Sequence, residues 1–286
     1  MKSQSAAKIK LPLGFWAGAR RLGIETRDLA RAAGLPLTVA AQPHVSAEEY
    51  FAIWQAYARL AGGAASAIVG MATAFEPVQY PPTVLATYHA RSYRDALQRM
   101  ARYKRMCPPE HLRIAEHNEV CAVDLEWTSA ETEGPAVLSG ITLAFLLELG
   151  RRGTGRPLTA RAAEFMQPLE NAEALERYLG CRVLSGAPRN RLTLHAADLD
   201  LPFVTYNEEL LELLTPALDR SLDEQTGSGR PFVETVKWIM KRGFSAGRTD
   251  IRTVARELGL SARTLQRRLT AEHTGFAPLL AQARHE

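Results

Sequence analysis

The chain has 286 residues, of which 46% are hydrophobic and 23% charged, and its formal net charge is +4. This length predicts one large or two moderate domains, able to bury a core without disulfides or bound metal. Three cysteines without a CxxC pair exclude a disulfide scaffold and the common zinc frameworks. The sequence has no apolar run of about 18 residues and no apolar N-terminal segment, so we expect a cytoplasmic protein that spans no membrane.

A polar segment divides the chain. Residues 221–229 contain a single apolar side chain, Leu222, and end in Gly-Ser-Gly, a composition typical of flexible linkers. We therefore expect a large domain over residues 1–220, a linker over 221–230 and a smaller domain over 231–286.

The first half of the large domain is expected to be helical. A helix over 15–33 would end at Gly34, and Ser46 with Glu49 forms the capping-box pattern that begins the next helix. A spacing of about 3.6 residues between apolar positions also predicts a helix over 93–106. Between these helices the chain is expected to loop at Pro77, Pro81 and Pro82.

The pattern then changes to that of β-strands. Apolar and polar residues alternate on both sides of Asn118, which predicts a β-hairpin with one buried face. A strongly apolar helix over 137–149 is expected to end at the glycines and arginines of 150–153. The remaining expected elements are strands over 162–166 and 191–195 and helices over 172–179 and 207–220. This irregular alternation indicates an α+β fold with a small antiparallel sheet.

The positive charge of the chain lies in its last fifth. Residues 230–286 hold eleven Lys/Arg and five Asp/Glu, an excess of six positive charges, whereas the first 229 residues have an excess of two negative charges. Such asymmetry is typical of a segment that binds an acidic polymer, although solvated surfaces also show it.

An all-α domain is expected in this basic segment. Thr249 or Asp250 would cap its second helix, which stops at Gly259, a residue suited to a left-handed turn. Ser261 would cap a third helix over 262–273. A short helix, a glycine turn and a second amphipathic helix form the helix-turn-helix arrangement, which places its last helix in the major groove of DNA.

The third helix offers the side chains that would read DNA bases. Leu265 and Leu269 are expected to face inward. The outward residues expected to contact base edges are Arg263, Thr264, Gln266 and Arg267, since arginine suits guanine and glutamine suits adenine. The residues expected to contact phosphates are Arg268, Lys241, Arg248 and Ser261. The alternative is a three-helix capping subdomain whose charges are merely solvated.

These residues resemble a known family. Residues 250–269 and 275–280 are similar to the first helix-turn-helix and the start of the connecting helix of the AraC/XylS family of bacterial transcription regulators. The large domain resembles the arabinose-binding-like N-terminal domain of one branch of that family, over residues 29–36, 50–54, 96–103 and 198–202. The resemblance implies a cytoplasmic, DNA-binding activator. Its implied partners are double-stranded DNA and a small organic effector. The resemblance also allows a second copy of the chain as a partner, in a homodimer.

The sequence departs from the family pattern at its end. Family DNA-binding domains carry two helix-turn-helix units joined by a long helix, and Glu286 corresponds to a position inside that helix. The DNA-binding domain is therefore expected to be incomplete, lacking the second unit. With one reading helix, each monomer is expected to have poor specific affinity, because a single small module buries little surface. The alternative function is a small-molecule sensor or interaction module without DNA binding.

The effector cannot be named from the large domain. His89 is either a pocket residue, a haem ligand or a satisfied core histidine, and the last is favoured. His111 and His117 lack acids or thiols at ligand spacing, so no metal site is expected. The aromatic stripe on the helix after Ser46 is expected to be core: Tyr50, Trp54 and Tyr57.

Catalytic motifs are absent from the sequence. It has no nucleophile elbow, no HExxH, no P-loop and no dinucleotide-binding glycine pattern after a strand. The chain is therefore not expected to be an enzyme, and no cofactor is expected.

Overall fold

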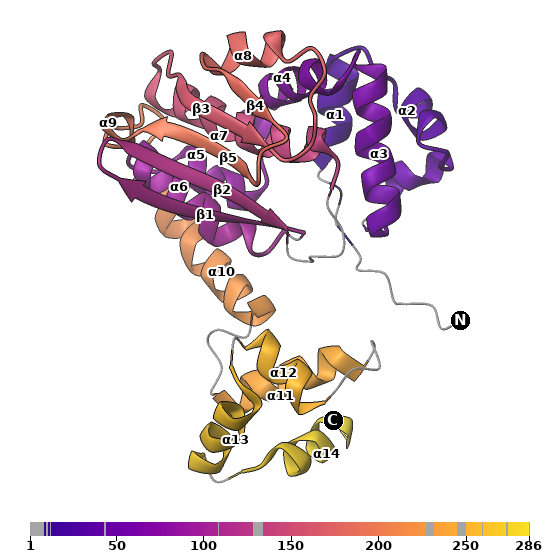
Figure 1. Ribbon diagram of the computed structural model, residues 1–286, viewed down its shortest axis with the longest axis vertical. Coiled ribbons are helices and arrows are strands. Elements are labelled where there is room, and N and C mark those ends of the chain that lie inside the picture. The colour runs from indigo at the N-terminus through magenta and orange to yellow at the C-terminus, as the bar shows by residue number, and fades with distance from the viewer. Residues whose placement is uncertain are drawn as a thin grey trace. The chain divides into compact units, whose positions relative to one another are not determined.

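The computed structural model describes residues 9, 11, 13–42, 44–107, 109–127, 134–226, 232–244, 250–258, 260–272 and 274–285. The chain divides into two compact units, one of residues 7–218 and one that contains residues 219–286. Figure 1 shows a sheet with helices packed on it in the larger unit and helices alone in the C-terminal unit.

The larger unit is mainly helical. Two 3-10 helices span Leu37–Ala41 and Pro77–Gln79. Its α-helices are α1 (Leu13–Arg21), α2 (Thr26–Ala32), α3 (Ala47–Leu60), α4 (Ala64–Ala74), α5 (Pro82–Tyr88), α6 (Tyr93–Lys104), α7 (Ala136–Thr154), α8 (Glu173–Leu179), α9 (Ala196–Leu199) and the beginning of α10 (Glu208–Thr226).

A five-stranded sheet lies beside these helices, in the order β1-β2-β5-β3-β4. Its strands are β1 (Glu110–His117), β2 (Val120–Trp127), β3 (Ala160–Phe165), β4 (Val183–Ser185) and β5 (Asn190–His195). The expected α+β class is confirmed. The sheet is mixed, however, and not wholly antiparallel, because β4 pairs with β3 in the parallel direction. Strand β4 has three residues, too few to show an alternating pattern in the sequence.

The predicted hairpin is β1–β2. Leu112 pairs with Leu125 and Ile114 with Val123 in an antiparallel register. Asn118 occupies the turn with a φ of 52°, a left-handed conformation that asparagine adopts more readily than most residues. The hairpin therefore has the turn residue and the buried face that its sequence predicts.

The helix expected over 15–33 is in fact two helices. Gly23 has a φ of 77°, which ends α1, and the Ile24 amide donates a hydrogen bond to the Ala19 carbonyl 2.9 Å away. Ile24 is buried after this turn, and α2 begins at Thr26. The single-helix prediction was wrong because Gly23 acts as a helix stop within an otherwise helical pattern.

Helix α7 does not end at Gly150-Arg151-Arg152-Gly153 as expected. It continues to Thr154 and is capped by Gly155, whose φ is 66°. A Cβ on Gly150 would lie 2.6 Å from the Tyr93 ring, and one on Gly153 would lie 2.4 Å from the Phe203 ring. Both glycines therefore serve close packing inside the helix, not its termination.

The expected linker is also partly helical. Helix α10 continues through Thr226, so residues 221–226 are the last turns of a helix and not flexible chain. Leu222, the apolar residue of that segment, is buried. The rest of the expected linker, residues 227–230, lies outside the described residues.

The helix after Ser46 begins as its sequence predicts. The Glu49 amide donates to the Ser46 hydroxyl at 3.1 Å, and the Glu49 carboxylate accepts from the Ser46 amide at 2.7 Å, which completes a capping box. The aromatic stripe of α3 is buried in the main core. It consists of Tyr50, Trp54 and Tyr57.

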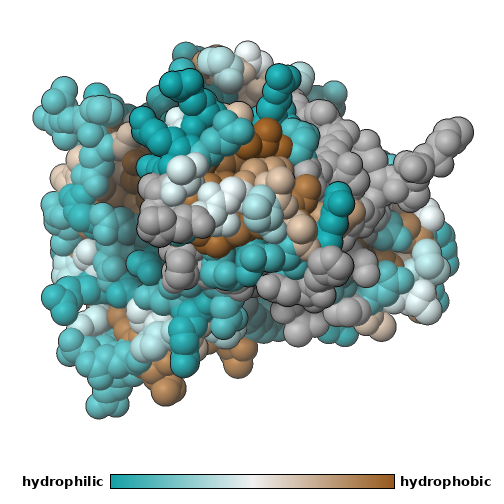
Figure 2. All heavy atoms as spheres, turned by 90° about the horizontal axis from the view of Figure 1, so that it is seen from below, coloured by the Kyte–Doolittle hydropathy of each residue, from teal (hydrophilic) through white to brown (hydrophobic). Residues whose placement is uncertain are grey.

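Figure 2 shows a face of the molecule on which hydrophilic residues predominate and hydrophobic ones form small patches. Large apolar side chains that are well exposed come from separate elements of the larger unit. They include Leu37, Val78, Leu184, Val204 and Leu213.

One cross-strand ion pair makes the stability of the larger unit depend on pH. The Arg191 guanidinium contacts both carboxylate oxygens of Asp124, at 2.6 and 2.7 Å, and these hydrogen bonds hold the pKa of Asp124 below its usual range. The pair therefore stabilises the fold above the unfolded-state pKa of about 4, and this contribution is lost as the pH falls through the folded-state pKa.

We expect Asp124→Asn to lower the free energy of unfolding by about 1.5 kcal/mol near neutral pH. The loss should shrink at about pH 3. Urea unfolding at the two pH values measures both quantities, and Asp28→Asn, on an exposed helix surface, is the control. An equal loss at the two pH values would contradict the assignment.

Candidate nucleic-acid interface

In the described residues of the C-terminal unit, four helices follow the end of α10 and pack around their own small core. They are α11 (Phe232–Phe244), α12 (Ile251–Glu257), α13 (Ala262–Ala271) and α14 (Phe276–His285). Helix α11 packs against α12 and α14, and α12 packs against α13. The buried residues of this core are Val236, Ile239, Met240, Val254, Ala255, Leu265, Leu269, Leu279 and Ala283.

Helix α12 begins at an aspartate cap. One Asp250 carboxylate oxygen accepts hydrogen bonds from the amides of Arg252 and Thr253, at 2.8 and 3.1 Å, and the other accepts from the Thr253 hydroxyl at 2.8 Å. The hydrogen bonds from Thr253 lower the pKa of Asp250. Of the two caps that the sequence left open, the structure therefore has Asp250; Thr249 lies outside the described residues.

A short turn leads from α12 to α13. The Leu260 amide donates to the Ala255 carbonyl at 2.8 Å, which folds the chain back after α12. The Ser261 hydroxyl accepts from the Thr264 amide at 3.1 Å and lies 2.8 Å from the Thr264 hydroxyl. Ser261 is thus the N-cap of α13, as expected. Gly259 lies outside the described residues.

Helix α13 has one buried and one exposed face. Leu265 and Leu269 have no exposed surface, whereas Arg263, Gln266 and Arg267 are exposed. The three polar residues occupy positions i, i+3 and i+4 and therefore share one side of the helix. The structure thus brings together three of the four residues expected to read bases.

The fourth residue expected to read bases, Thr264, is less exposed than the other three. It is half-buried, and its hydroxyl lies against Ser261 at the helix start. Helix α13 is also shorter than the expected 262–273. It ends at Ala271, where the Glu272 amide still bonds to the Arg268 carbonyl at 3.2 Å, and His273 lies outside the described residues.

The residues expected to contact phosphates come from different helices and do not form one row as those expected to read bases do. The Arg268 guanidinium lies 5.5 Å from the centre of the Phe232 ring, which draws this side chain toward the start of α11. Lys241 is exposed on the last turns of α11. Arg248 lies outside the described residues, and Ser261 holds the cap of α13.

Two contacts of Arg242 were not expected from the sequence. The Arg242 guanidinium lies 4.7 Å from the centre of the Trp238 ring and 3.7 Å from the Glu257 carboxylate. Arg242 and Glu257 come from α11 and α12, so this ion pair joins the two helices. No local pattern in the sequence signals it.

Comparison with known families identifies the larger unit. The family described as "Arabinose-binding domain of AraC transcription regulator, N-term" matches residues 23–203, more than half of the chain. The chain belongs to the AraC family of transcription regulators. The family resemblance of the sequence is therefore confirmed.

A solved structure supports the fold of this AraC-family regulator. The crystal structure of the transcriptional regulator CdpR from Pseudomonas aeruginosa matches with a TM-score of 0.50 and 17% sequence identity. The match covers 94% of this chain and 83% of that one. No curated protein matches the chain.

Two histidines of the larger unit, His89 and His111, contact or lie near residues of other segments. The Nδ1 atom of His89 lies 2.6 Å from the Thr205 carbonyl oxygen, so the ring ties α5 to the segment before α10. His89 is thus hydrogen-bonded, as favoured, but it is half-buried and not part of the core. Burial and the charge of Arg105 lower the pKa of His111. In the part of the chain that the structure describes, no three His, Cys, Asp or Glu side chains gather to hold a metal.

None of the described helices has both the length and the apolar character that a membrane crossing requires.

Proposed function

We propose that this AraC-family regulator binds double-stranded DNA and controls transcription in response to a small organic effector, with α13 in the major groove. The observation that carries the proposal is that α13 has one buried and one exposed face. Leu265 and Leu269 fix one face in the core, and this leaves Arg263, Gln266 and Arg267 exposed together on the other.

The chemistry of this exposed face suits base edges. Arginine forms two parallel hydrogen bonds with the O6 and N7 atoms of guanine, and glutamine does so with the N6 and N7 atoms of adenine. Thr264, at the start of the helix, would contact a neighbouring base. Lys241, Arg248, Arg268 and Ser261 are assigned to phosphates, which position the helix and carry no sequence information.

The two units divide the task. The larger unit binds the effector, and the effector favours one of two arrangements of the chain, which changes promoter occupancy. We infer that the regulator activates transcription. We also infer that it acts as a homodimer, in which two copies of α13 read two half-sites. It acts on DNA in the cytoplasm and performs no catalysis.

Selection from a random-sequence duplex library tests the proposal. The immobilised 286-residue chain is incubated with the library, and the retained duplexes are sequenced. We expect one motif to be enriched, and its affinity to fall with salt by a log–log slope of about 0.9 per phosphate contact. A chain that enriches no motif would contradict the proposal, and one that retains no duplex at all would favour a sensor without DNA binding.

A further inference from the structure

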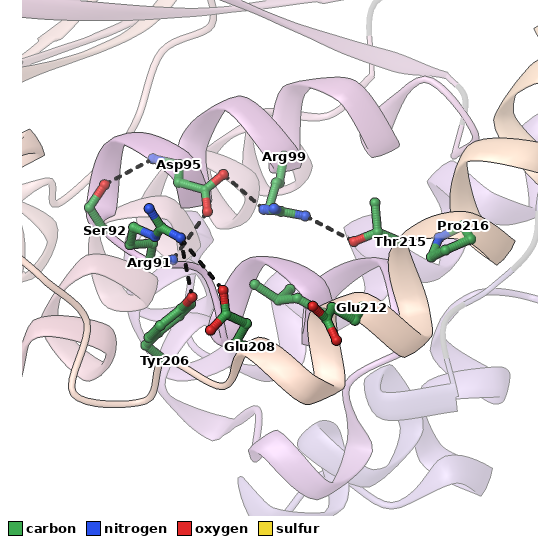
Figure 3. Close-up of a pocket in the computed structure, with 10 residues that line it drawn as sticks. Arg91, Ser92, Asp95, Arg99, Tyr206, Glu208, Glu212, Thr215 and Pro216 are labelled. Carbon is green, nitrogen blue, oxygen red and sulfur yellow. Dashed lines mark hydrogen bonds and ion pairs between the residues drawn. The ribbon is translucent and has the colours of Figure 1, made fainter.

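A groove in the larger unit lies between α6 and the first turns of α10. It has a volume of ≈ 640 Å³. One wall carries Arg91, Asp95 and Arg99, and the other carries Tyr206, Glu208 and Glu212 (Figure 3). All its lining residues belong to the unit of residues 7–218. We call this feature the α6–α10 groove.

Arg91 provides an accessible cation at one end of the groove. Its Nη2 atom lies 3.4 Å from the Tyr206 hydroxyl and 3.8 Å from the Glu208 carboxylate. The Arg91 and Glu208 side chains are 74% and 66% exposed, and an ion pair so exposed contributes about 1 kcal/mol or less. A ligand carboxylate can therefore replace Glu208 at little cost and gain a bidentate contact with the guanidinium.

The far end of the groove is already neutral. The Arg99 Nε atom donates to the Asp95 carboxylate at 2.8 Å, and its Nη1 atom donates to the Thr215 hydroxyl at 3.2 Å. The dashed lines of Figure 3 follow this chain of contacts from α6 to α10. Because these charges satisfy one another, this end of the groove requires no charge from a ligand.

Between these two ends lies Glu212, one turn along α10 from Glu208 and three residues before Thr215 (Figure 3). Within the described residues, the Glu212 carboxylate has no hydrogen bond or ion pair, and Figure 3 draws no dashed line to it. Pro216 lies inside α10 and has no N–H, so the Glu212 carbonyl lacks its helical donor. A carboxylate without a partner suits an ammonium or guanidinium group.

We propose that the α6–α10 groove binds a small linear zwitterion, with its carboxylate at Arg91 and its cationic group at Glu212. The four residue steps from Glu208 to Glu212 span about 6 Å of helix, which sets the separation of the two ligand charges. An amino acid whose amine is at the far end of a short chain has this separation. The inference rests on the proposed function in that this zwitterion would be the effector.

Through α10, such a ligand can change the conformation of the chain beyond the groove. Its first part is held to the larger unit by a small apolar cluster, separate from the main core, of Ala86, Tyr103, Leu211 and Leu218. The same helix continues to Thr226, beyond the end of that unit. A ligand that joins α6 to α10 adds to this attachment and therefore favours the attached state of the helix.

Isothermal titration calorimetry of the 286-residue chain with δ-aminovalerate tests the proposal. Valerate and pentylamine, which each lack one of the two charges, are the ligand controls. We expect saturable binding with a Kd on the order of a millimolar and at least roughly tenfold weaker binding of both controls. Arg91→Gln and Glu212→Gln should each weaken binding of δ-aminovalerate to a similar degree, and Glu209→Gln, on the same helix outside the groove, should leave it unchanged.

Two results would overturn the groove assignment: no saturable binding of δ-aminovalerate, or binding that neither groove variant weakens. The duplex selection separates this failure from that of the proposed function. A chain that enriches a DNA motif but does not bind δ-aminovalerate refutes the groove alone. A chain that binds δ-aminovalerate but enriches no motif refutes DNA reading and leaves the groove in place.

Discussion

Replacing Arg263 and Arg267 together by alanine is expected to abolish sequence-specific duplex binding and to leave the fold intact. Both side chains are exposed on α13, and neither forms an ion pair within the described residues, so their loss removes no packing. Each bidentate contact with guanine is worth about 1–3 kcal/mol of discrimination. The double variant should therefore bind the selected motif at least roughly a hundredfold more weakly, since about 1.4 kcal/mol corresponds to a factor of ten.

Fluorescence anisotropy with the selected duplex and a scrambled duplex measures this loss. The ratio of the two affinities should fall toward one in the double variant. Arg27→Ala removes an equally exposed charge from the larger unit, with 72% of its side chain exposed, and should leave the ratio unchanged. A double variant that retains the full ratio would refute the assignment of Arg263 and Arg267 to bases.

Gly150→Ala is expected to destabilise the larger unit strongly, although alanine usually stabilises a helix relative to glycine by about 1 kcal/mol. The added Cβ would lie 2.6–2.8 Å from three carbons of the Tyr93 ring. That ring is fully buried, its hydroxyl donates to the Leu146 carbonyl at 2.9 Å, and it stacks on Phe203. Because the ring has no room to retreat, we expect a loss of about 1–3 kcal/mol from overpacking.

Thermal unfolding followed by circular dichroism tests this expectation, with Gly70→Ala in α4 as the matched control. A Cβ at Gly70 would be no closer than 3.3 Å to the end of the Leu22 side chain, which can shift. The control should therefore be close to the wild type, while Gly150→Ala melts at a lower temperature. If the Gly150 variant were as stable as the control, the close packing of α7 on Tyr93 would be wrong.

Local signals allowed several elements to be predicted. The caps at Ser46, Asp250 and Ser261 each depend on contacts within three residues, so the sequence contains both partners. The outward face of α13 follows in the same way from the 3.6-residue period, because Leu265 and Leu269 determine which side is buried.

The elements that escaped prediction depend on distant partners. Helix α4 is apolar around most of its circumference and packs against α7, so it shows no amphipathic period. Gly150 and Gly153 resemble helix stops until the rings of Tyr93 and Phe203 are placed beside them. In general, a glycine has the same local signal whether it ends a helix or admits a neighbour.

The same limit applies to the functional residues. The stacking of Arg268 on Phe232 joins α13 to α11, and no spacing in the sequence predicts it. The α6–α10 groove joins Arg91 to Glu208 and Glu212, more than a hundred residues later in the chain. None of these three residues belongs to a sequence motif, so this candidate site became visible only once the structure placed the helices side by side.

Helix α13 is proposed to read bases in the major groove, and dimethyl sulfate interference on the selected duplex tests this role most directly. Methylation places a methyl group on guanine N7, the major-groove atom that Arg263 or Arg267 would contact. We predict that methylation of guanines within the motif blocks binding of the 286-residue chain, and that Arg267→Ala loses this sensitivity at one guanine. Interference confined to minor-groove adenines, or a guanine pattern identical in the wild type and the variant, would contradict the claim.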